Sequence, residues 1–99
     1  MSRLSPLDRV VKNNGFIDAE IDNEVVTLNI DSGVCHGLNR VGSRIWRLLG
    51  DPIRIGDICT TLQGEYDVEP IDCERQVLDL LEEMRAEGLI RNADETSPV

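Results

Sequence analysis

The chain has 99 residues, is 40% hydrophobic, and carries 19 acidic against 10 basic side chains, for a formal net charge of −9. This length allows one domain with a single modest core. The acidity disfavours nucleic acid as a partner, because phosphate backbones are bound mainly by basic side chains. No apolar run exceeds two residues, so the sequence predicts no membrane-spanning segment.

The cysteine pattern indicates free thiols. Cys35, Cys59 and Cys73 are odd in number and show no C-x-x-C spacing, and residues 1–4 lack the apolar run of a signal peptide. We therefore expect a cytoplasmic protein with reduced cysteines. A metal site would need these thiols and His36 to converge from separate elements, without the close-spaced ligand pairs typical of zinc modules. No metal or other cofactor is expected.

The first half of the chain has the patterns of β-structure. Residues 1–8 are expected to be a flexible lead-in, and residues 9–12 a short strand that ends at an Asn-Asn-Gly turn. Period-2 alternation predicts strands at residues 16–21 and 24–30, joined by a tight turn at Asp22-Asn23. The faces expected to be buried carry the apolar residues Ile17, Ala19, Ile21, Val26, Leu28 and Ile30. A second turn then leads to a last strand over Val34 to Leu38.

The second half of the chain has helical patterns. Asn39 is a strong N-cap candidate for a first helix that ends before Pro52, and a second helix is predicted over about residues 54–65. A third helix is predicted from Pro70 to about Glu87, where Gly88 and Leu89 suit a Schellman ending. Its apolar positions are Cys73, Val77, Leu78, Leu80, Leu81 and Met84. This stripe is wide enough for part of it to line a groove beside the sheet.

Together these elements predict an α+β fold. The expected arrangement is a three-stranded antiparallel β meander followed by three helices, which resembles a winged helix-turn-helix. We expect one domain over residues 9–91 and a disordered tail over residues 92–99. Small meanders leave exposed edges whose backbone donors and acceptors another chain can complete. The oligomeric state is left open between a monomer and an edge-paired dimer.

The residue pairs that could carry catalysis do not support an enzyme. Cys35 and His36 are neighbours in a strand, so their side chains point to opposite faces and are poorly placed to hydrogen-bond. The chain has no other histidine, and no glycine cluster has the spacing of a phosphate or dinucleotide loop. A non-catalytic binding protein is therefore the expected class.

Two charged features bear on the choice of partner. Arg40, Arg44 and Arg47 recur along one face of the first helix, which is typical of a solvated face paired with carboxylates, or of a docking surface for an acidic partner. Winged-helix folds often bind DNA, which makes a DNA-binding regulator the second candidate. The third helix argues against it, because its acidic side chains outnumber its basic ones and would be repelled by phosphates.

A family resemblance makes the functional expectation more specific. Leu38-Asn39-x-x-Gly42-x-x-Ile45-Trp46, then Glu65 to Val68, Val77 to Leu81 and Gly88 to Ile90, resemble the PqqD family. That family supplies leader-recognition domains for ribosomally made, post-translationally modified peptides. The family often has an aspartate where this chain has Gln76, so no role is carried over from that position. As a separate domain, the chain is most similar to the leader-binding proteins of lasso-peptide pathways.

The resemblance implies recognition of a precursor's leader peptide by strand addition. The leader would pair with the edge strand Val34, Cys35, His36, Gly37 and Leu38, and its side chains would enter a groove walled by Val77, Leu78, Leu81 and Met84. Periodicity leaves open which of Leu78 and Leu80 faces the groove and which faces the core. The protein would then present the precursor to a maturation enzyme, such as a leader-cleaving cysteine protease that works beside a cyclase. Neither nucleic acid nor a membrane is expected as a partner. An adaptor for another protein stays a third candidate.

Overall fold

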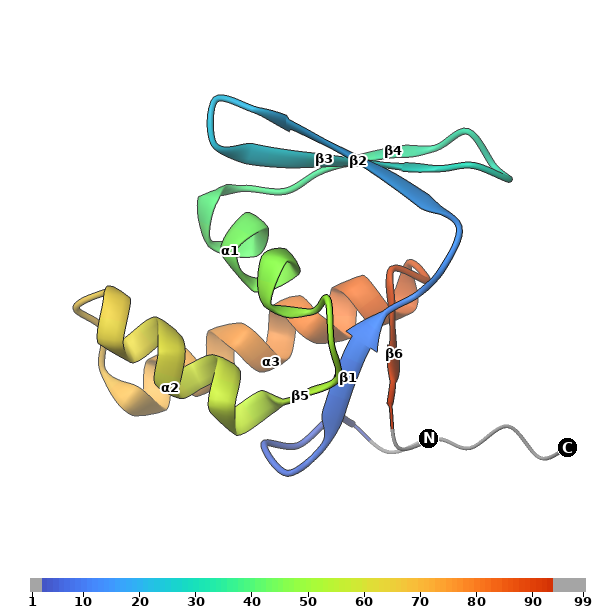
Figure 1. The fold of residues 1–99 in the computed structure, drawn as a ribbon. Helices are drawn as coiled ribbons and strands as arrows, with labels where there is room; N and C mark the ends of the chain where they lie inside the picture. The colour runs from blue at the N-terminus through green and yellow to red at the C-terminus, as the bar shows by residue number, and fades with distance from the viewer. Residues whose placement is uncertain (1–2, 94–99) are drawn as a thin grey trace, which may run out of the picture.

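The computed structural model describes residues 3–93, and its elements form two small sheets and three helices. In chain order they are β1 (Arg9–Lys12), β2 (Phe16–Ile21), β3 (Glu24–Asn29), β4 (Cys35–Gly37), α1 (Arg40–Leu48), β5 (Ile53–Arg54), α2 (Ile55–Glu65), α3 (Pro70–Ala86) and β6 (Ile90–Asn92). The predicted α+β architecture of a meander followed by helices is confirmed. The three helices lie on one side of the sheet formed by β2, β3 and β4 (Figure 1).

The meander follows the predicted turns. Strands β2 and β3 pair antiparallel from Phe16 opposite Asn29 to Ile21 opposite Glu24. The connecting residues Asp22 and Asn23 both have positive φ, 52° and 68°, which is the geometry of a two-residue hairpin turn with the right twist for antiparallel strands. Strand β4 then pairs with β3, so that β2 and β4 are the two edges of this sheet.

The second sheet was not predicted, although β1 lies where a short strand was expected. Strand β1 pairs with β5 on one side and with β6 on the other, so the order is β5-β1-β6. This sheet ties the N-terminal segment to the connection between α1 and α2 and to the segment that follows α3 (Figure 1). Asn92 belongs to β6, which corrects the predicted start of the tail at that residue, and residues 94–99 lie outside the described part of the chain.

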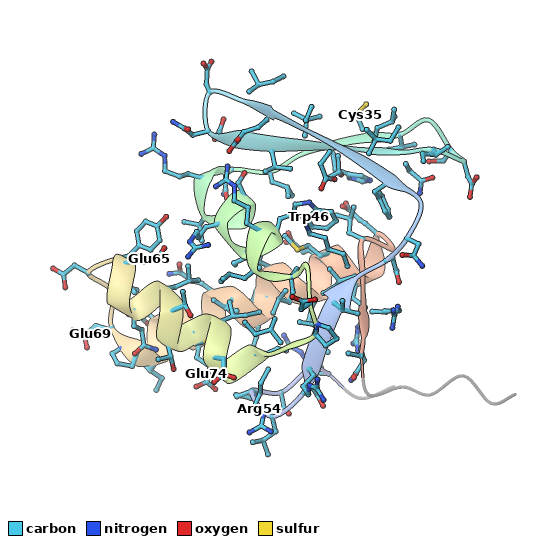
Figure 2. The ribbon with its side chains drawn as sticks, viewed as in Figure 1. Cys35, Trp46, Arg54, Glu65, Glu69 and Glu74 are labelled. Carbon is cyan, nitrogen blue, oxygen red and sulfur yellow. The ribbon has the colours of Figure 1, made fainter. Side chains whose placement is uncertain are left out.

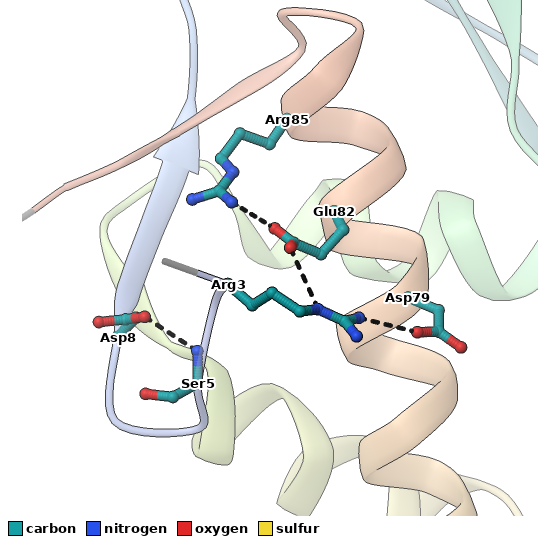
Figure 3. Close-up of polar contacts among 6 residues, drawn as sticks. All are labelled: Arg3, Ser5, Asp8, Asp79, Glu82 and Arg85. Carbon is teal, nitrogen blue, oxygen red and sulfur yellow. Dashed lines mark hydrogen bonds and ion pairs between the residues drawn. The ribbon is translucent and has the colours of Figure 1, made fainter. Parts of the chain in front are cut away.

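Residues 3–8 are held against the helices, which corrects the expectation of a flexible lead-in. Leu4 is buried in the core, and the carbonyl of Pro6 accepts a hydrogen bond of 2.9 Å from the backbone N–H of Gly56. Arg3 lies along α3, where its guanidinium reaches Asp79 at 3.2 Å and Glu82 at 3.5 Å (Figure 3). The backbone hydrogen bond to the start of α2 therefore fixes the position of the N-terminal segment before β1.

The helix ends form as the sequence predicts. The Asn39 side chain caps α1 by accepting a hydrogen bond of 2.8 Å from the backbone N–H of Gly42. At the end of α3, Gly88 has a φ of +77°, and the Leu89 N–H donates to the Met84 carbonyl at 2.9 Å. Together with the bond of 3.0 Å from the Gly88 N–H to the Arg85 carbonyl, this is a Schellman ending. No helix in the described part of the chain is long and apolar enough to cross a membrane.

The core lies between the helices and the inner side of both sheets. It is built around fully buried side chains of α1, α2 and α3, with contributions from β1, β3 and β6. Trp46 lies beneath the meander (Figure 2), where its ring meets Phe16 edge-on at 6.3 Å between centroids, and its Nε1 donates to Asp18 Oδ2 at 2.8 Å. The Lys12 ammonium lies 4.7 Å from the centroid of the Trp46 ring. Trp46 therefore joins α1 to the inner side of β2.

The prediction of which sheet face is buried was wrong. Ile17, Ala19 and Ile21 of β2 are exposed, and the residues of β3 that point into the core are Val25 and Thr27. The inner side of β2 carries Phe16, Asp18 and Glu20 instead, because these side chains contact Trp46 and Arg47 of α1. Alternation located the strands, whereas partners on α1 decide which face is covered.

Thr27 provides a test of the inner face. Its side chain is fully buried, and its hydroxyl has no hydrogen-bond partner among the described residues. Valine has the same shape without the hydroxyl, so Thr27→Val is expected to raise the free energy of unfolding by about 1 kcal/mol. Urea unfolding of the two proteins measures the difference. A less stable variant would show that the hydroxyl is satisfied in the folded protein.

Candidate functional site

Strand β4 presents unpaired backbone groups to one side. The Leu38 N–H donates to the Val25 carbonyl at 2.8 Å, and the Asn29 N–H donates to the Val34 carbonyl at 2.9 Å. Hydrogen-bonded pairs alternate along an antiparallel ladder, so His36, which lies opposite Thr27, is the bonded residue between these two. The backbone N–H and C=O groups of Cys35 and Gly37 therefore point away from β3, toward the open edge.

Ser43 fixes the end of this edge strand against α1. Its buried hydroxyl accepts a hydrogen bond of 2.7 Å from the Val25 N–H and donates one of 3.1 Å to the Leu38 carbonyl. The hydroxyl thus stands between β3 and the end of β4 and satisfies one group of each. This contact, with the Asn39 cap, sets the angle at which the chain turns from the strand into the helix.

A groove runs between the open edge of β4 and helix α3. Its first part has a volume of about 460 Å³, with walls formed by β4, the start of α1 and the C-terminal half of α3. The second part, of about 440 Å³, lies between α1, α2 and the N-terminal half of α3. The two parts adjoin at Asn39, Leu80 and Glu83, which line both. A chain added to β4 would lie along this groove.

The structure brings most of the expected binding residues to the groove. Cys35, His36, Gly37, Leu38 and Met84 line its first part, and Val77 lines the second. Leu81 is fully buried and lines neither part, and Val34 lies outside both. Leu78, which was expected at the groove, also lines neither part. Leu80 lines both, so it is Leu80, of the two positions that periodicity left open, that lies at the groove.

The groove carries negative charge. Asp79 and Glu83 lie along the second part, Glu83 and Glu87 along the first, and neither part is lined by a lysine or arginine of the described chain. His36 Nδ1 lies 3.1 Å from Glu87 Oε2, so the carboxylate at the C-terminal end of α3 reaches across the groove to β4. This charge is unsuited to a nucleic-acid backbone and suits a peptide with basic side chains.

The three arginines of α1 do not form one free surface. Arg44 binds both carboxylate oxygens of Glu65 on α2, with a shortest contact of 2.6 Å, and this hydrogen bonding holds the pKa of Glu65 below its usual range. Arg47 pairs with Glu20 of β2. Arg40 is exposed at the start of the helix. Arg44 and Arg47 therefore tie α1 to α2 and β2. This agrees with the first interpretation, a solvated face whose arginines pair with carboxylates.

The cysteines differ in accessibility. Cys35 is exposed on the side of the sheet away from α1 (Figure 2), whereas Cys59 and Cys73 are buried between α2 and α3. Burial raises the pKa of the Cys59 thiol to about 11. Cys35 and His36 point to opposite faces as expected, because Cys35 shares a face with Leu28 and His36 with Thr27. The described residues hold no cluster of side chains that could bind a metal ion.

Thiol labelling tests this arrangement. In the folded protein at pH 8, Ellman's reagent is expected to react rapidly with one of the three thiols, and with the other two only after unfolding. The buried thiols are slow because the reagent cannot reach them and because the raised pKa keeps Cys59 protonated. Cys35→Ala should remove the fast phase. Rapid reaction of a second thiol would contradict the described packing of α2 on α3.

Sequence reasoning missed Glu83 as a groove residue and left the choice of Leu80 open. Leu80 and Glu83 are one helical turn apart on the same side of α3, and both face the second cavity, which α1 and α2 complete. Their spacing was visible in the sequence, but the neighbour that each side of α3 would meet was not. The role of Ser43 between β3 and β4 could not be predicted, because the sequence shows only that it lies four residues after the cap Asn39.

Comparisons with known proteins agree with this geometry. Residues 24–90 match the family described as "Coenzyme PQQ synthesis protein D (PqqD)". The solved structure "TbiB1 in Complex with the TbiA(beta) Leader Peptide" superimposes with a TM-score of 0.76 at 32% identity, covering 88% of this chain and 99% of that one. The structure "Lasso peptide synthetase B1 complexed with the leader peptide" gives 0.75 at 27% identity, covering 83% and 96%. A search among curated proteins found no match. On the family match and the shared fold, the chain belongs to the PqqD family.

Proposed function

We propose that this protein binds the leader segment of a ribosomally made precursor peptide, as an added strand on the open edge of β4. The observation that carries the proposal is the outward direction of the Cys35 and Gly37 backbone groups beside a groove walled by α3. Both similar structures are described as complexes with a leader peptide, which supports the same ligand class for this chain.

The geometry defines how an antiparallel strand would be held. Its backbone would pair with Cys35 and Gly37, and alternate side chains would point either into the groove or to the outer side of the sheet. Apolar side chains facing inward would contact Leu80 and Met84, and basic ones would meet Glu83. Backbone bonding gives affinity for many sequences, whereas the groove gives selectivity.

The protein itself would carry out no bond chemistry. By holding the leader, it would raise the effective concentration of the attached core peptide near a maturation enzyme. We infer that this enzyme is a leader-cleaving cysteine protease of a lasso-peptide pathway, because a lasso peptide synthetase B1 is among the similar structures. We further infer that the active form has a free β4 edge, since a dimer paired through β4 would block the leader.

Titration against a labelled leader peptide tests the proposal. The fluorescent leader should come from the precursor encoded beside this chain, with a scrambled leader of the same composition as control. We expect the leader to bind saturably at micromolar concentration or below. The scrambled peptide should bind much more weakly. A folded protein that binds neither peptide would exclude leader recognition. A duplex DNA titration at low salt checks the second candidate, for which a strong salt dependence is required.

A further inference from the structure

We propose that the outer face of the β2–β3–β4 sheet is a docking surface for the maturation enzyme, through an apolar patch on the enzyme that is framed by basic side chains. This outer face is formed by Ile17, Ala19, Ile21, Val26, Leu28 and Ile30. The inference rests on the proposed function for the identity of the partner. The existence of the surface rests on the structure alone.

The outer face is continuous and apolar. Ile17 lies opposite Leu28, and Ala19 opposite Val26, so their side chains form two adjacent rows across β2 and β3. Ile17 is 55% exposed, Ile21 60% and Ile30 58%. All three helices lie on the other side of the sheet, and no described element covers this one (Figure 1). Apolar clusters of this kind on a soluble protein mark an interaction site.

The charge around this face identifies the kind of partner. Residues 13–39 contain five carboxylates and no lysine or arginine. Asp18 and Glu20 pair with Lys12 and Arg47 on the inner side. The remaining three, Asp22, Glu24 and Asp31, have no ion-pair partner among the described residues; we call them the acidic rim.

The acidic rim argues against a second copy of the chain as the occupant. Two copies meeting through this face would bring like charges together, and each copy carries a net charge of −9. An anionic membrane is disfavoured for the same reason. An apolar protein patch surrounded by lysine or arginine would complement both the apolar centre of the outer face and the acidic rim.

The position of the face suits this role. Cys35 of β4 continues the row of Ile17 and Leu28, so the outer face reaches the strand that would pair with the leader. The leader would lie at the edge of the sheet and the enzyme on its outer face. Both could be bound at once, with the precursor held close to the enzyme.

The test compares matched variants in two binding measurements. The outer-face variant is Ile17→Thr with Ile21→Thr, since threonine keeps a β-branched side chain. The control is Leu7→Thr with Ile71→Thr, because these side chains are 77% and 79% exposed elsewhere. Affinity is measured for the purified protease encoded beside this chain and, separately, for the labelled leader. Glu24→Lys tests the rim without changing the apolar surface.

The outer-face variant is expected to bind the protease at least about tenfold more weakly, while its leader affinity stays within twofold. The control should match the unmodified protein, and Glu24→Lys should weaken protease binding at low salt. Equal protease affinity for all variants would overturn the inference. It would also be overturned if sedimentation shows that the unmodified protein is a dimer and that the outer-face variant is a monomer. If leader binding itself is absent, the proposed function fails. If the leader binds and the protease does not, only this inference fails.

Discussion

Cys35→Pro is expected to weaken leader binding at least about tenfold while the protein stays folded. Proline at this position removes the N–H that points to the open edge and leaves the ladder between β3 and β4 intact, because the bonded residue of β4 is His36. A lost backbone hydrogen bond is worth about 1 kcal/mol, and the partner carbonyl on the leader would be left unsatisfied. The leader titration measures the change directly.

Cys35→Ala is the matched control for this prediction. It removes the same thiol but keeps the N–H, so its leader affinity should equal that of the unmodified protein. A second measurement uses the peptide: leaders methylated at single backbone nitrogens should lose affinity at every other position along the paired segment. Equal affinity for the proline and alanine variants, together with no alternation along the leader, would exclude strand addition at β4.

The sequence predicted the strands of the meander well, and the reason is local. Strands β2 and β3 carry apolar residues at alternate positions, and Asp22-Asn23 supplies the positive φ values that a two-residue turn needs. What it could not show was which face would be covered. Ile17 and Ile21 look like core residues, but Asp18 faces inward because it accepts the indole N–H of Trp46. Contacts between distant segments override the local pattern.

The second sheet escaped prediction for a related reason. Strand β1 has no neighbour in sequence to pair with, because its partners β5 and β6 lie beyond α1 and α3. Two of these strands are only two and three residues long. Pairing of such short, distant segments leaves little periodic signal. In contrast, the ends of α1 and α3 were predicted correctly, since caps depend on residues adjacent in sequence.

The groove was predicted in outline, with one position on α3 left open. The wide apolar stripe of α3 indicated that one part of the helix covers the core and another part lines a groove. Periodicity alone did not distinguish Leu78 from Leu80, because each is adjacent to buried positions. The placement of α1 and α2 around α3 decides it, since Leu80 lies in the cavity that these helices complete. The open edge of β4 followed from the strand order.

Leu80→Glu is expected to weaken leader binding by about thirtyfold. Leu80 lines both parts of the groove, so the variant loses apolar contact with the leader, worth about 2 kcal/mol for a leucine side chain. The new carboxylate would also stand beside Glu83 and Asp79, where the apolar leader side chain that contacts position 80 cannot solvate it. Leu80 is a better choice than Met84, which is almost fully buried and whose replacement by glutamate would unfold the core.

Ile71→Glu is the matched control, because it introduces the same charge in the same helix at a side chain that is 79% exposed and lines neither part of the groove. It should leave leader affinity unchanged apart from a small effect that salt removes. Thermal unfolding of both variants separates a loss of binding from a loss of structure. If folded Leu80→Glu binds the leader as tightly as Ile71→Glu, leader side chains do not enter the groove. Affinity would then rest on the β4 backbone alone, and selectivity for a leader would have to come from another surface.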